Sequence, residues 1–367
     1  MLHVMDTRPD SPTPRRGAVT NAVGRFERHA RHREDDGWNR PPAAEDWEEP
    51  PPLRTHVQRD ASRSILARNT SPDIPFDRSI NPYRGCEHGC VYCFARPTHA
   101  YLGLSPGLDF ETRLFEKPDA PALLEAELRK PSYRPAPIAI GTNTDPYQPI
   151  ERTRRIMRGI LEVLRDYRHP VTIVTKSALV TRDIDILAPM AAANLARVAV
   201  SITSLDRILQ STLEPRAATP GARLATVKAL SDAGIPTAVM VAPVIPALTD
   251  HEIEALLAKA AEAGAEAAGW IFLRLPLEVR DLFEEWLREH HPARADRVLS
   301  LVRQARDGQL YQSAFASRMR GSGPVAELIG QRFRIAARRL NLTPRDVALD
   351  VSQFRRPPRK GDQMTLF

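Results

Sequence analysis

All three cysteines of the chain lie within eight residues of one another, as Cys86, Cys90 and Cys93. Secreted domains held by disulfides spread an even number of cysteines along the chain, whereas a tight odd group in a reducing compartment indicates a metal or cofactor site. The spacing Cys-x3-Cys-x2-Cys lets one loop wrap a cubane iron–sulfur cluster, because each thiolate binds a different iron. The fourth iron is then open to the amino and carboxylate groups of a small molecule.

The main alternative is a zinc site in which His88 or His99 completes a Cys3His set, a common structural arrangement. Zinc knuckles usually form small autonomous modules, whereas this loop is embedded at the start of a long strand–helix pattern. Gly85 and Gly89 also stand beside the cysteines, where a backbone must turn tightly around a cluster. The sequence therefore favours the iron–sulfur cluster.

Short β-branched runs alternate with longer segments in which apolar residues recur at helical spacing. Six runs predict strands, at Ser79–Tyr83, Pro137–Thr142, Val171–Lys176, Arg197–Thr203, Pro236–Ala242 and Trp270–Leu275. Among the segments that predict helices are Ile150–Asp166, Gly221–Ala233 and Asp250–Ala263. This alternation is typical of a parallel α/β sheet, and periodicity leaves open whether the sheet is doubly wound or curled into a partial barrel. Either form collects functional residues beyond the carboxyl ends of its strands.

Composition divides the chain into four parts. Residues 1–60 are rich in Pro, Arg, Asp and Glu with little periodicity, so we expect a largely disordered extension or one draped over the domain. Residues 61–290 form the predicted core, 291–351 a C-terminal helical extension and 352–367 a basic tail. No secretory signal or membrane-spanning run is evident, which predicts a cytoplasmic protein. The net charge of +7 suits nucleic acid as a partner, but a solvated arginine-rich surface gives the same total.

The run Cys86-x3-Cys90-x-Tyr92-Cys93 resembles the signature of the radical S-adenosylmethionine superfamily. From about Ser71 to Leu342, the chain resembles an uncharacterised bacterial family related to spore photoproduct lyase and often labelled DNA repair photolyase. The resemblance implies a partial (β/α)6 barrel with a [4Fe–4S] cluster in the loop after the first strand. It also implies a lyase-like enzyme that cleaves S-adenosylmethionine to a 5′-deoxyadenosyl radical, with a reductant such as flavodoxin or ferredoxin as partner.

Polar residues at the predicted strand ends are candidates for holding this cofactor. By the resemblance, the loop after the second strand holds the methionine amino group, and Thr142, Thr144 and Asp145 are its candidates, although the Gly-Gly-Glu of many members is missing. A turn at Asp145-Pro146 is the structural alternative. Lys176 ends the third strand and can bind the cofactor carboxylate or extend to solvent.

Further candidates lie later in the chain. Ser201 and Thr203 share one face of the fourth strand, which would be the barrel interior. Glu214 and Arg216 are candidates for the ribose hydroxyls and the carboxylate of the cofactor, with a surface ion pair beside a Thr219 helix cap as the alternative.

Two isolated side chains complete the set. Tyr92 can pack on the cofactor, or it can be an ordinary loop aromatic that fills the core. Arg274 interrupts an apolar strand and can orient an anionic substrate or the cofactor, while a structural ion pair explains it equally well.

The substrate is the open part of the interpretation. Spore photoproduct lyase returns a hydrogen atom from a cysteine outside the cluster motif, and this chain has no such cysteine. That difference argues against the same repair cycle, unless Tyr101, Tyr147 or another tyrosine is the donor, and it excludes an auxiliary cysteine-ligated cluster. The substrate stays unidentified, with a nucleic-acid lesion as one candidate and protein modification as another. A non-catalytic iron–sulfur protein for nucleic-acid binding or electron transfer is the alternative from another class.

Overall fold

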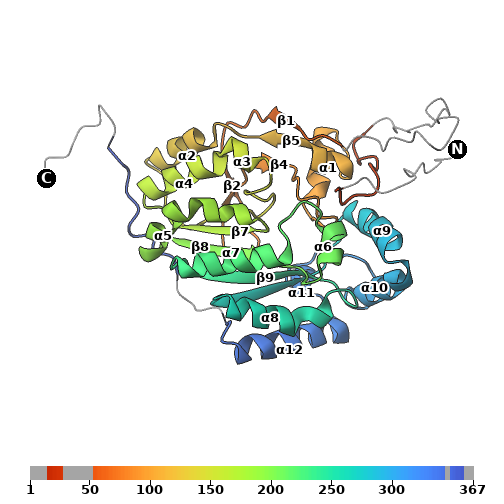
Figure 1. Cartoon of the computed structure of the whole chain (residues 1–367). Coiled ribbons are helices and arrows are strands. Elements are labelled where there is room, and N and C mark those ends of the chain that lie inside the picture. The colour runs from red at the N-terminus through yellow and green to blue at the C-terminus, as the bar shows by residue number, and fades with distance from the viewer. Residues whose placement is uncertain (1–14, 28–52, 344–347, 359–367) are drawn as a thin grey trace, which may run out of the picture.

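The computed structural model describes residues 15–27, 53–343 and 348–358, in which the largest element is a seven-stranded sheet of order β10-β9-β8-β7-β6-β3-β2 (Figure 1). Its strands are β2 (Leu66–Arg68), β3 (Arg78–Ile80), β6 (Ile138–Ile140), β7 (Val171–Thr175), β8 (Ala196–Ser201), β9 (Thr237–Val244) and β10 (Ala267–Phe272). Every pairing among β3 and β6 to β10 is parallel, and only β2 runs antiparallel. The six predicted strands are thus confirmed in the order that a partial (β/α)6 barrel requires.

Helices connect these strands, and neighbouring helices pack side by side along the sheet (Figure 1). They are α2 (Ala120–Arg129), α3 (Glu151–Arg154), α4 (Ile156–Asp166), η2 (Ala178–Asp183), α5 (Ile184–Ala192), α6 (Arg207–Leu213), α7 (Pro220–Asp232), η3 (Asp250–Glu252) and α8 (Ile253–Glu262). In β7, Val171, Ile173 and Thr175 are buried while the residues between them are half-buried. A strand covered on both faces in this way is expected of a parallel sheet between layers.

Three element boundaries differ from the prediction. The first predicted strand is divided by Pro82, which cannot donate a backbone hydrogen bond, into β3 and β4 (Tyr83–Arg84). Strand β4 belongs to a second sheet of order β1-β5-β4, with β1 (His56–Arg59) and β5 (Arg113–Glu116). The predicted helix 150–166 breaks at Arg155, whose φ of 55° is left-handed. Strand β10 ends at Phe272, and Arg274 therefore lies beyond it, near Pro276.

The last part of the chain is helical, as predicted. It contains α9 (Val279–His290), α10 (Pro292–Gln304), α11 (Ser317–Arg320) and α12 (Gly323–Arg339). Helix α9 packs against α10, and α12 packs against α8 (Figure 1). None of the helices within the described ranges has the length and apolar character that a bilayer crossing needs.

Parts of both predicted disordered ends are ordered. Residues 53–60 include β1, and residues 15–27 contain the buried Arg16, Ala18 and Val19. The rest of the predicted extension, 1–14 and 28–52, lies outside the described residues, as do 359–367 of the predicted tail. The ordered parts of the N-terminal extension agree with the alternative that it is draped over the domain, because they pack on distant parts of the chain.

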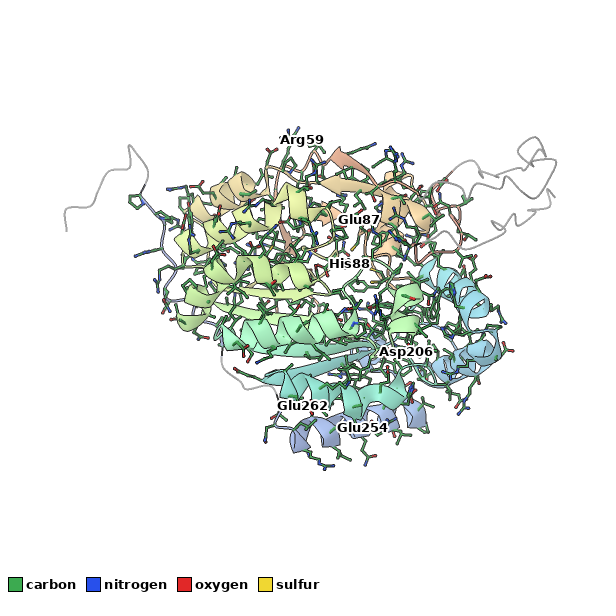
Figure 2. The ribbon with its side chains drawn as sticks, in the orientation of Figure 1. Arg59, Glu87, His88, Asp206, Glu254 and Glu262 are labelled. Carbon is green, nitrogen blue, oxygen red and sulfur yellow. The ribbon has the colours of Figure 1, made fainter. Side chains whose placement is uncertain are left out.

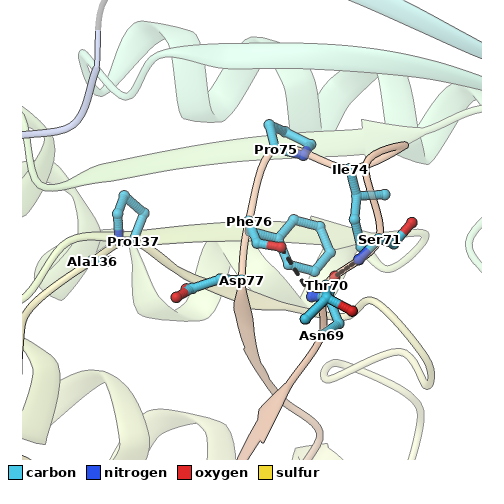
Figure 3. Close-up of a pocket in the computed structure, with 9 residues that line it drawn as sticks. All are labelled: Asn69, Thr70, Ser71, Ile74, Pro75, Phe76, Asp77, Ala136 and Pro137. Atoms are coloured by element: carbon cyan, nitrogen blue, oxygen red, sulfur yellow. Dashed lines mark hydrogen bonds between the residues drawn. The ribbon is translucent and has the colours of Figure 1, made fainter.

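A clasp of side chains links the loop after edge strand β2 to helix α11, which packs against the other edge strand, β10. Arg318 bonds to Asp73 and, at 2.5 Å, to the Ser71 hydroxyl, and the Ala316 N–H donates to Asp73 at 2.6 Å. Beside the clasp is a pocket of about 460 Å³ lined by residues 69–71 and 74–77 together with Ala136 and Pro137 (Figure 3). The charged residue in its lining, Asp77, is paired with Arg78.

The ordered segment 348–358 docks through Phe354, whose ring lies 5.7 Å from Tyr133 and 5.6 Å from His169. His169 is fully buried, Tyr133 Oη lies 2.7 Å from its Nε2, and burial lowers the pKa of His169 to about 4. The folded state therefore favours neutral His169. Its contribution to stability is complete above the unfolded pKa of about 6.5 and is lost as the pH falls towards 4.

We expect the free energy of unfolding to fall by on the order of 3 kcal/mol between pH 7 and pH 4 through His169 alone. Urea titrations at several pH values measure this loss. His169→Gln keeps a neutral hydrogen-bonding side chain and should flatten the pH dependence in that window. An unchanged slope in the variant would contradict the assignment.

Candidate functional site

The cysteines lie on a loop between β4 and the 3₁₀ helix η1 (Arg96–Leu102). All three are free; Cys86 and Cys90 are buried and Cys93 is half-buried. Two tight turns shape the loop, because the Gly89 N–H donates to the Cys86 carbonyl at 3.3 Å and the Cys93 N–H to the Cys90 carbonyl at 3.1 Å. The turns bring the three thiols to one part of the molecule.

Glycine is required next to the first cysteine. Gly85 has a φ of 76°, and a Cβ there would meet Leu114 Cδ2 at 2.6 Å and the Phe110 carbonyl oxygen at 2.8 Å. Gly89 is also left-handed, with a φ of 68°. The expectation that these glycines allow a tight turn is confirmed.

A buried ion pair supports the loop from behind. Arg96 donates to the carbonyls of Gly89 at 3.0 Å and Cys90 at 2.9 Å, and its Nη2 lies 2.5 Å from Glu111 Oε1. Both side chains have no exposed surface. Glu111 belongs to helix α1 (Leu108–Thr112), and no spacing in the sequence indicated this pair.

The N-terminal strap, residues 15–27, completes this support. The N–H groups of Gly17 and Ala18 donate to the Glu111 carboxylate at 3.0 and 2.9 Å. A Cβ on Gly17 would lie 1.8 Å from the Gly89 carbonyl oxygen, so the strap touches the cysteine loop itself. Thr20 then bonds to Glu285 of α9, which links the loop to the C-terminal helices.

Burial sets the chemistry of the thiols. It raises the pKa of Cys86 well above its ordinary value, with Asp145 adding to the effect. Burial followed by the Glu214 charge raises the pKa of Cys90 to about 12, although Lys176 acts in the opposite direction. Buried thiolates therefore need a positive partner, which the irons of a cluster provide.

The arrangement suits a cluster better than a single ion. Within the described part of the chain, no three His, Cys, Asp or Glu side chains meet at one ion position. His99, one of the predicted zinc ligands, has its Nε2 2.9 Å from the Arg113 carbonyl oxygen, and His88 Nδ1 lies 3.4 Å from Asp145. Cubane ligands bind different irons and need not meet at one point, whereas the four ligands of zinc must.

Tyr92 and Glu214, both predicted site residues, contact each other. The Tyr92 hydroxyl and Arg223 donate to the Glu214 carboxylate, and the Thr203 hydroxyl donates to it at 2.6 Å. Burial alone would raise the pKa of Glu214, but Arg223 and Lys176 outweigh it and hold the value at about 2. Both carboxylate oxygens are thus engaged by protein groups, and Arg223 is a partner that sequence reasoning missed.

Asp145 organises the neighbouring strand ends. It accepts hydrogen bonds from the Thr175 hydroxyl and the Lys176 N–H, each at 2.7 Å, and from the Tyr147 N–H at 2.9 Å. Burial would raise its pKa, yet His88 and these hydrogen bonds lower it to about 2. The structural role expected as an alternative for Asp145 is therefore present.

The other hydroxyl residues bond to backbone. Thr144 donates to the Tyr83 carbonyl at 3.0 Å, and Ser201 donates to the Ala242 carbonyl at 3.2 Å. Thr142 is half-buried and lies two residues beyond the end of β6. These three side chains lie at the strand ends as predicted.

Among the charged candidates for cofactor binding, Lys176 remains available to bind a ligand. Among the described residues its ammonium has no carboxylate within ion-pair distance, and it lies 5.8 Å from the centre of the Tyr92 ring. Its charge acts on both Cys90 and Glu214. An uncommitted ammonium beside buried thiols is suited to bind a carboxylate.

Arg216 forms an ion pair with a residue of the cysteine loop. Its partner is Glu87, at 3.0 Å, and Glu87 is almost fully buried inside the cysteine loop. Gln148 joins them, because its Oε1 accepts from the Glu87 N–H at 2.8 Å. Thr219 caps helix α7, as the alternative interpretation expected. Figure 2 shows Glu87 and His88 near the centre of the molecule.

The two candidate tyrosine donors differ in their surroundings. Tyr101 is 72% exposed and stacks with Phe26 of the strap at 5.1 Å. Tyr147 is fully buried, with the Arg182 guanidinium 5.9 Å from its ring centre. The donor role stays a prediction for both.

Comparison with known proteins supports the same assignment. The profile described as "Radical SAM superfamily" matches residues 80–260. An uncharacterized protein of Mycobacterium tuberculosis is 43% identical over 232 residues, which cover 63% of this chain and 68% of that protein. One of Methanocaldococcus jannaschii is 29% identical over 173 residues, which cover 47% of this chain and 62% of that protein.

The fold is similar to solved structures as well. Spore photoproduct lyase complexed with dinucleoside spore photoproduct has a TM-score of 0.53 and 15% sequence identity, over 77% of this chain and 78% of that one. A cysteine-to-serine mutant of the same lyase gives the same TM-score of 0.53 and 15% identity, with the same coverage of 77% and 78%. At this identity the similarity concerns the fold, and it agrees with the partial barrel.

Proposed function

Because the chain belongs to the radical SAM superfamily, which implies a [4Fe–4S] cluster and S-adenosylmethionine, we propose that Cys86, Cys90 and Cys93 bind three irons of that cluster. The fourth iron is left for the amino and carboxylate groups of S-adenosylmethionine. The observation that carries the proposal is the group of three free thiols, two of them buried and one half-buried, on a single loop at the head of the parallel sheet.

Residues of the chain itself position the cofactor. Lys176, which has no anionic partner of its own among the described residues, binds the carboxylate of S-adenosylmethionine. The network of Tyr92, Glu214 and Arg223 fixes the aromatic ring beside the thiols, while Asp145 holds the strand-end loops in place. Thr142, Thr144, Ser201 and Arg216 complete the proposed set. When bound, the cluster and cofactor supply a 5′-deoxyadenosyl radical that abstracts hydrogen.

The proposed substrate is a nucleic-acid lesion. Fold similarity to spore photoproduct lyase in complex with a dinucleoside photoproduct supports it, together with the net charge of +7. With every cysteine of the chain committed to the cluster, no protein thiol remains to return a hydrogen atom. A repair cycle of the thiol-dependent kind would therefore need another hydrogen donor, such as Tyr101 or Tyr147. We propose a flavodoxin or ferredoxin as reductant and the cytoplasm as compartment, which the three free thiols suit.

The test is reductive cleavage. Anaerobically reconstituted protein with dithionite and S-adenosylmethionine is expected to release 5′-deoxyadenosine and methionine. Protein that carries its full iron and sulfide content but releases neither product would contradict the radical enzyme. The same protein would then fit the non-catalytic alternative.

Lys176→Ala tests the proposed carboxylate contact. Loss of a charge-assisted hydrogen bond, about 1.5–3 kcal/mol, predicts a KM for S-adenosylmethionine raised by roughly 10- to 100-fold. Iron content should stay at the wild-type level, because Lys176 is not a ligand. Lys228→Ala, which removes the ammonium of an exposed pair with Asp232 on α7, is the matched control. Equal KM values in the two variants would contradict the contact.

A further inference from the structure

Arg274 lies just beyond the carboxyl end of β10 and reaches the cysteine loop. Its guanidinium carbon is 4.9 Å from the centre of the Phe94 ring, and Phe94 directly follows Cys93. On the other side, Arg274 Nη1 lies 3.5 Å from the sulfur of Met319 in α11. Two neutral side chains therefore hold this guanidinium in place at the carboxyl-terminal edge of the sheet.

The charge of Arg274 is not balanced within the described residues. Its Nε is buried without a hydrogen-bond partner, and no carboxylate lies within ion-pair distance. Asp73 also faces this region, but its carboxylate is already bonded to Arg318 and the Ala316 N–H. A buried N–H without an acceptor costs about 1–3 kcal/mol, which a purely structural role would leave uncompensated.

A second unbalanced guanidinium lies nearby. Arg306 is fully buried and donates to the carbonyls of Leu273, Ser317 and Arg318, while its Nε has no partner among the described residues. Burial, and then the charge of Arg274, lower the pKa of Arg306 to about 10. Both groups are positive at neutral pH, so this end of the sheet attracts anions.

We infer that Arg274 and Phe94 form a binding site for a phosphate ester of the substrate, an inference that rests on the proposed function. The planar guanidinium can bond two phosphate oxygens through Nε and one Nη, which satisfies the buried Nε. Phe94 is 43% exposed and offers a ring on which a base can stack. A phosphate held here brings the rest of the substrate next to Cys93.

Direct binding tests the site without turnover. Fluorescence anisotropy of a labelled single-stranded thymidine oligomer of about ten nucleotides measures affinity over a series of salt concentrations, with no reductant present. We compare the full chain with Arg274→Gln, Arg274→Lys and Arg332→Gln. Arg332 is the matched control, because it lies on α12 and is paired with Glu254.

Arg274→Gln is expected to weaken binding by at least about tenfold and to lower the salt slope by about one phosphate contact. Arg274→Lys keeps the positive charge but not the planar pair of N–H donors, so its affinity should lie between those of Arg274→Gln and wild type. Arg332→Gln should change the affinity by less than about twofold. Affinities of Arg274→Gln and Arg332→Gln that agree would overturn the proposal.

A second measurement uses only the wild-type protein, in case the Arg274 variants do not fold. An oligomer of the same bases with an uncharged backbone should bind at least about tenfold more weakly, and equal binding would overturn the site. Competition by thymidine monophosphate identifies the source of the phosphate. Competition at a concentration similar to that of the unlabelled oligomer indicates a small phosphate ester, and much weaker competition indicates a polynucleotide. Both results support the site. If the wild-type protein formed no 5′-deoxyadenosine, the proposed function would be contradicted, whereas the measured affinities would still support the phosphate site.

Discussion

Cys90→Ser is expected to leave the protein with less than about a tenth of its wild-type iron, because removal of one thiolate costs far more affinity than the 10- to 100-fold that loss of a supporting contact costs. The serine hydroxyl is similar in size but does not ionise in a buried position to bind iron. Release of 5′-deoxyadenosine should fall below detection. Iron and sulfide analysis after anaerobic reconstitution measures the first effect, and chromatography of the reaction products measures the second.

His99→Gln separates the cluster from the zinc alternative. A Cys3His zinc site completed by His99 would lose its metal in this variant, and one completed by His88 would lose it in His88→Gln, whereas a cluster held by three cysteines should keep its iron in both. His99 has no exposed surface, so the fold of the variant is checked by its urea midpoint. Stoichiometric zinc in wild type, or full iron in Cys90→Ser, would contradict the assignment.

The second large effect is expected for Glu111→Ala. The substitution leaves the Arg96 charge buried without its partner, and breaking such a pair costs about 3–5 kcal/mol of unfolding free energy. It also removes the acceptor of the Gly17 and Ala18 N–H groups, so the strap should become accessible to trypsin at Arg15 and Arg16. Urea titration and timed proteolysis measure the two results.

Asp232→Ala is the control for this experiment. It removes an exposed carboxylate that pairs with Lys228, and such pairs contribute about 0–1 kcal/mol. Glu111→Gln should be intermediate, because the amide oxygen still accepts one N–H but carries no charge. If Glu111→Ala and Asp232→Ala unfold at the same urea concentration, the buried pair does not support the loop.

Local patterns predicted most of the fold. The presence and order of the six parallel strands, the turns at Gly85 and Gly89 and the alternative of a Thr219 cap all depend on neighbouring residues, and the structure contains each of them. The errors arose where one residue interrupts a pattern. Pro82 divides the first strand, and Arg155 breaks a helix whose apolar periodicity continues on both sides.

Partnerships between distant residues could not be predicted in this way. Arg216 and Glu214 were singled out as candidates for binding the cofactor, but their ion-pair partners, Glu87 and Arg223, follow only from the three-dimensional contacts. Periodicity indicates which face of a helix or strand is buried. It does not indicate which distant side chain contacts a residue on that face. For the same reason, composition allowed for a segment draped over the domain but did not indicate that the backbone N–H groups of the strap bond to the buried Glu111 carboxylate.

The strap also has a consequence for biosynthesis. Gly17 and Ala18 are made 94 and 93 residues before Glu111, the carboxylate to which they bind. At a translation rate of about 5–20 residues per second, their docking partner leaves the ribosome on the order of 5–20 seconds after them. The strap therefore cannot dock on the cysteine loop when the loop is synthesised, because Glu111 is not yet present. The N-terminal segment, which is synthesised first, covers the loop only after Glu111 has been added.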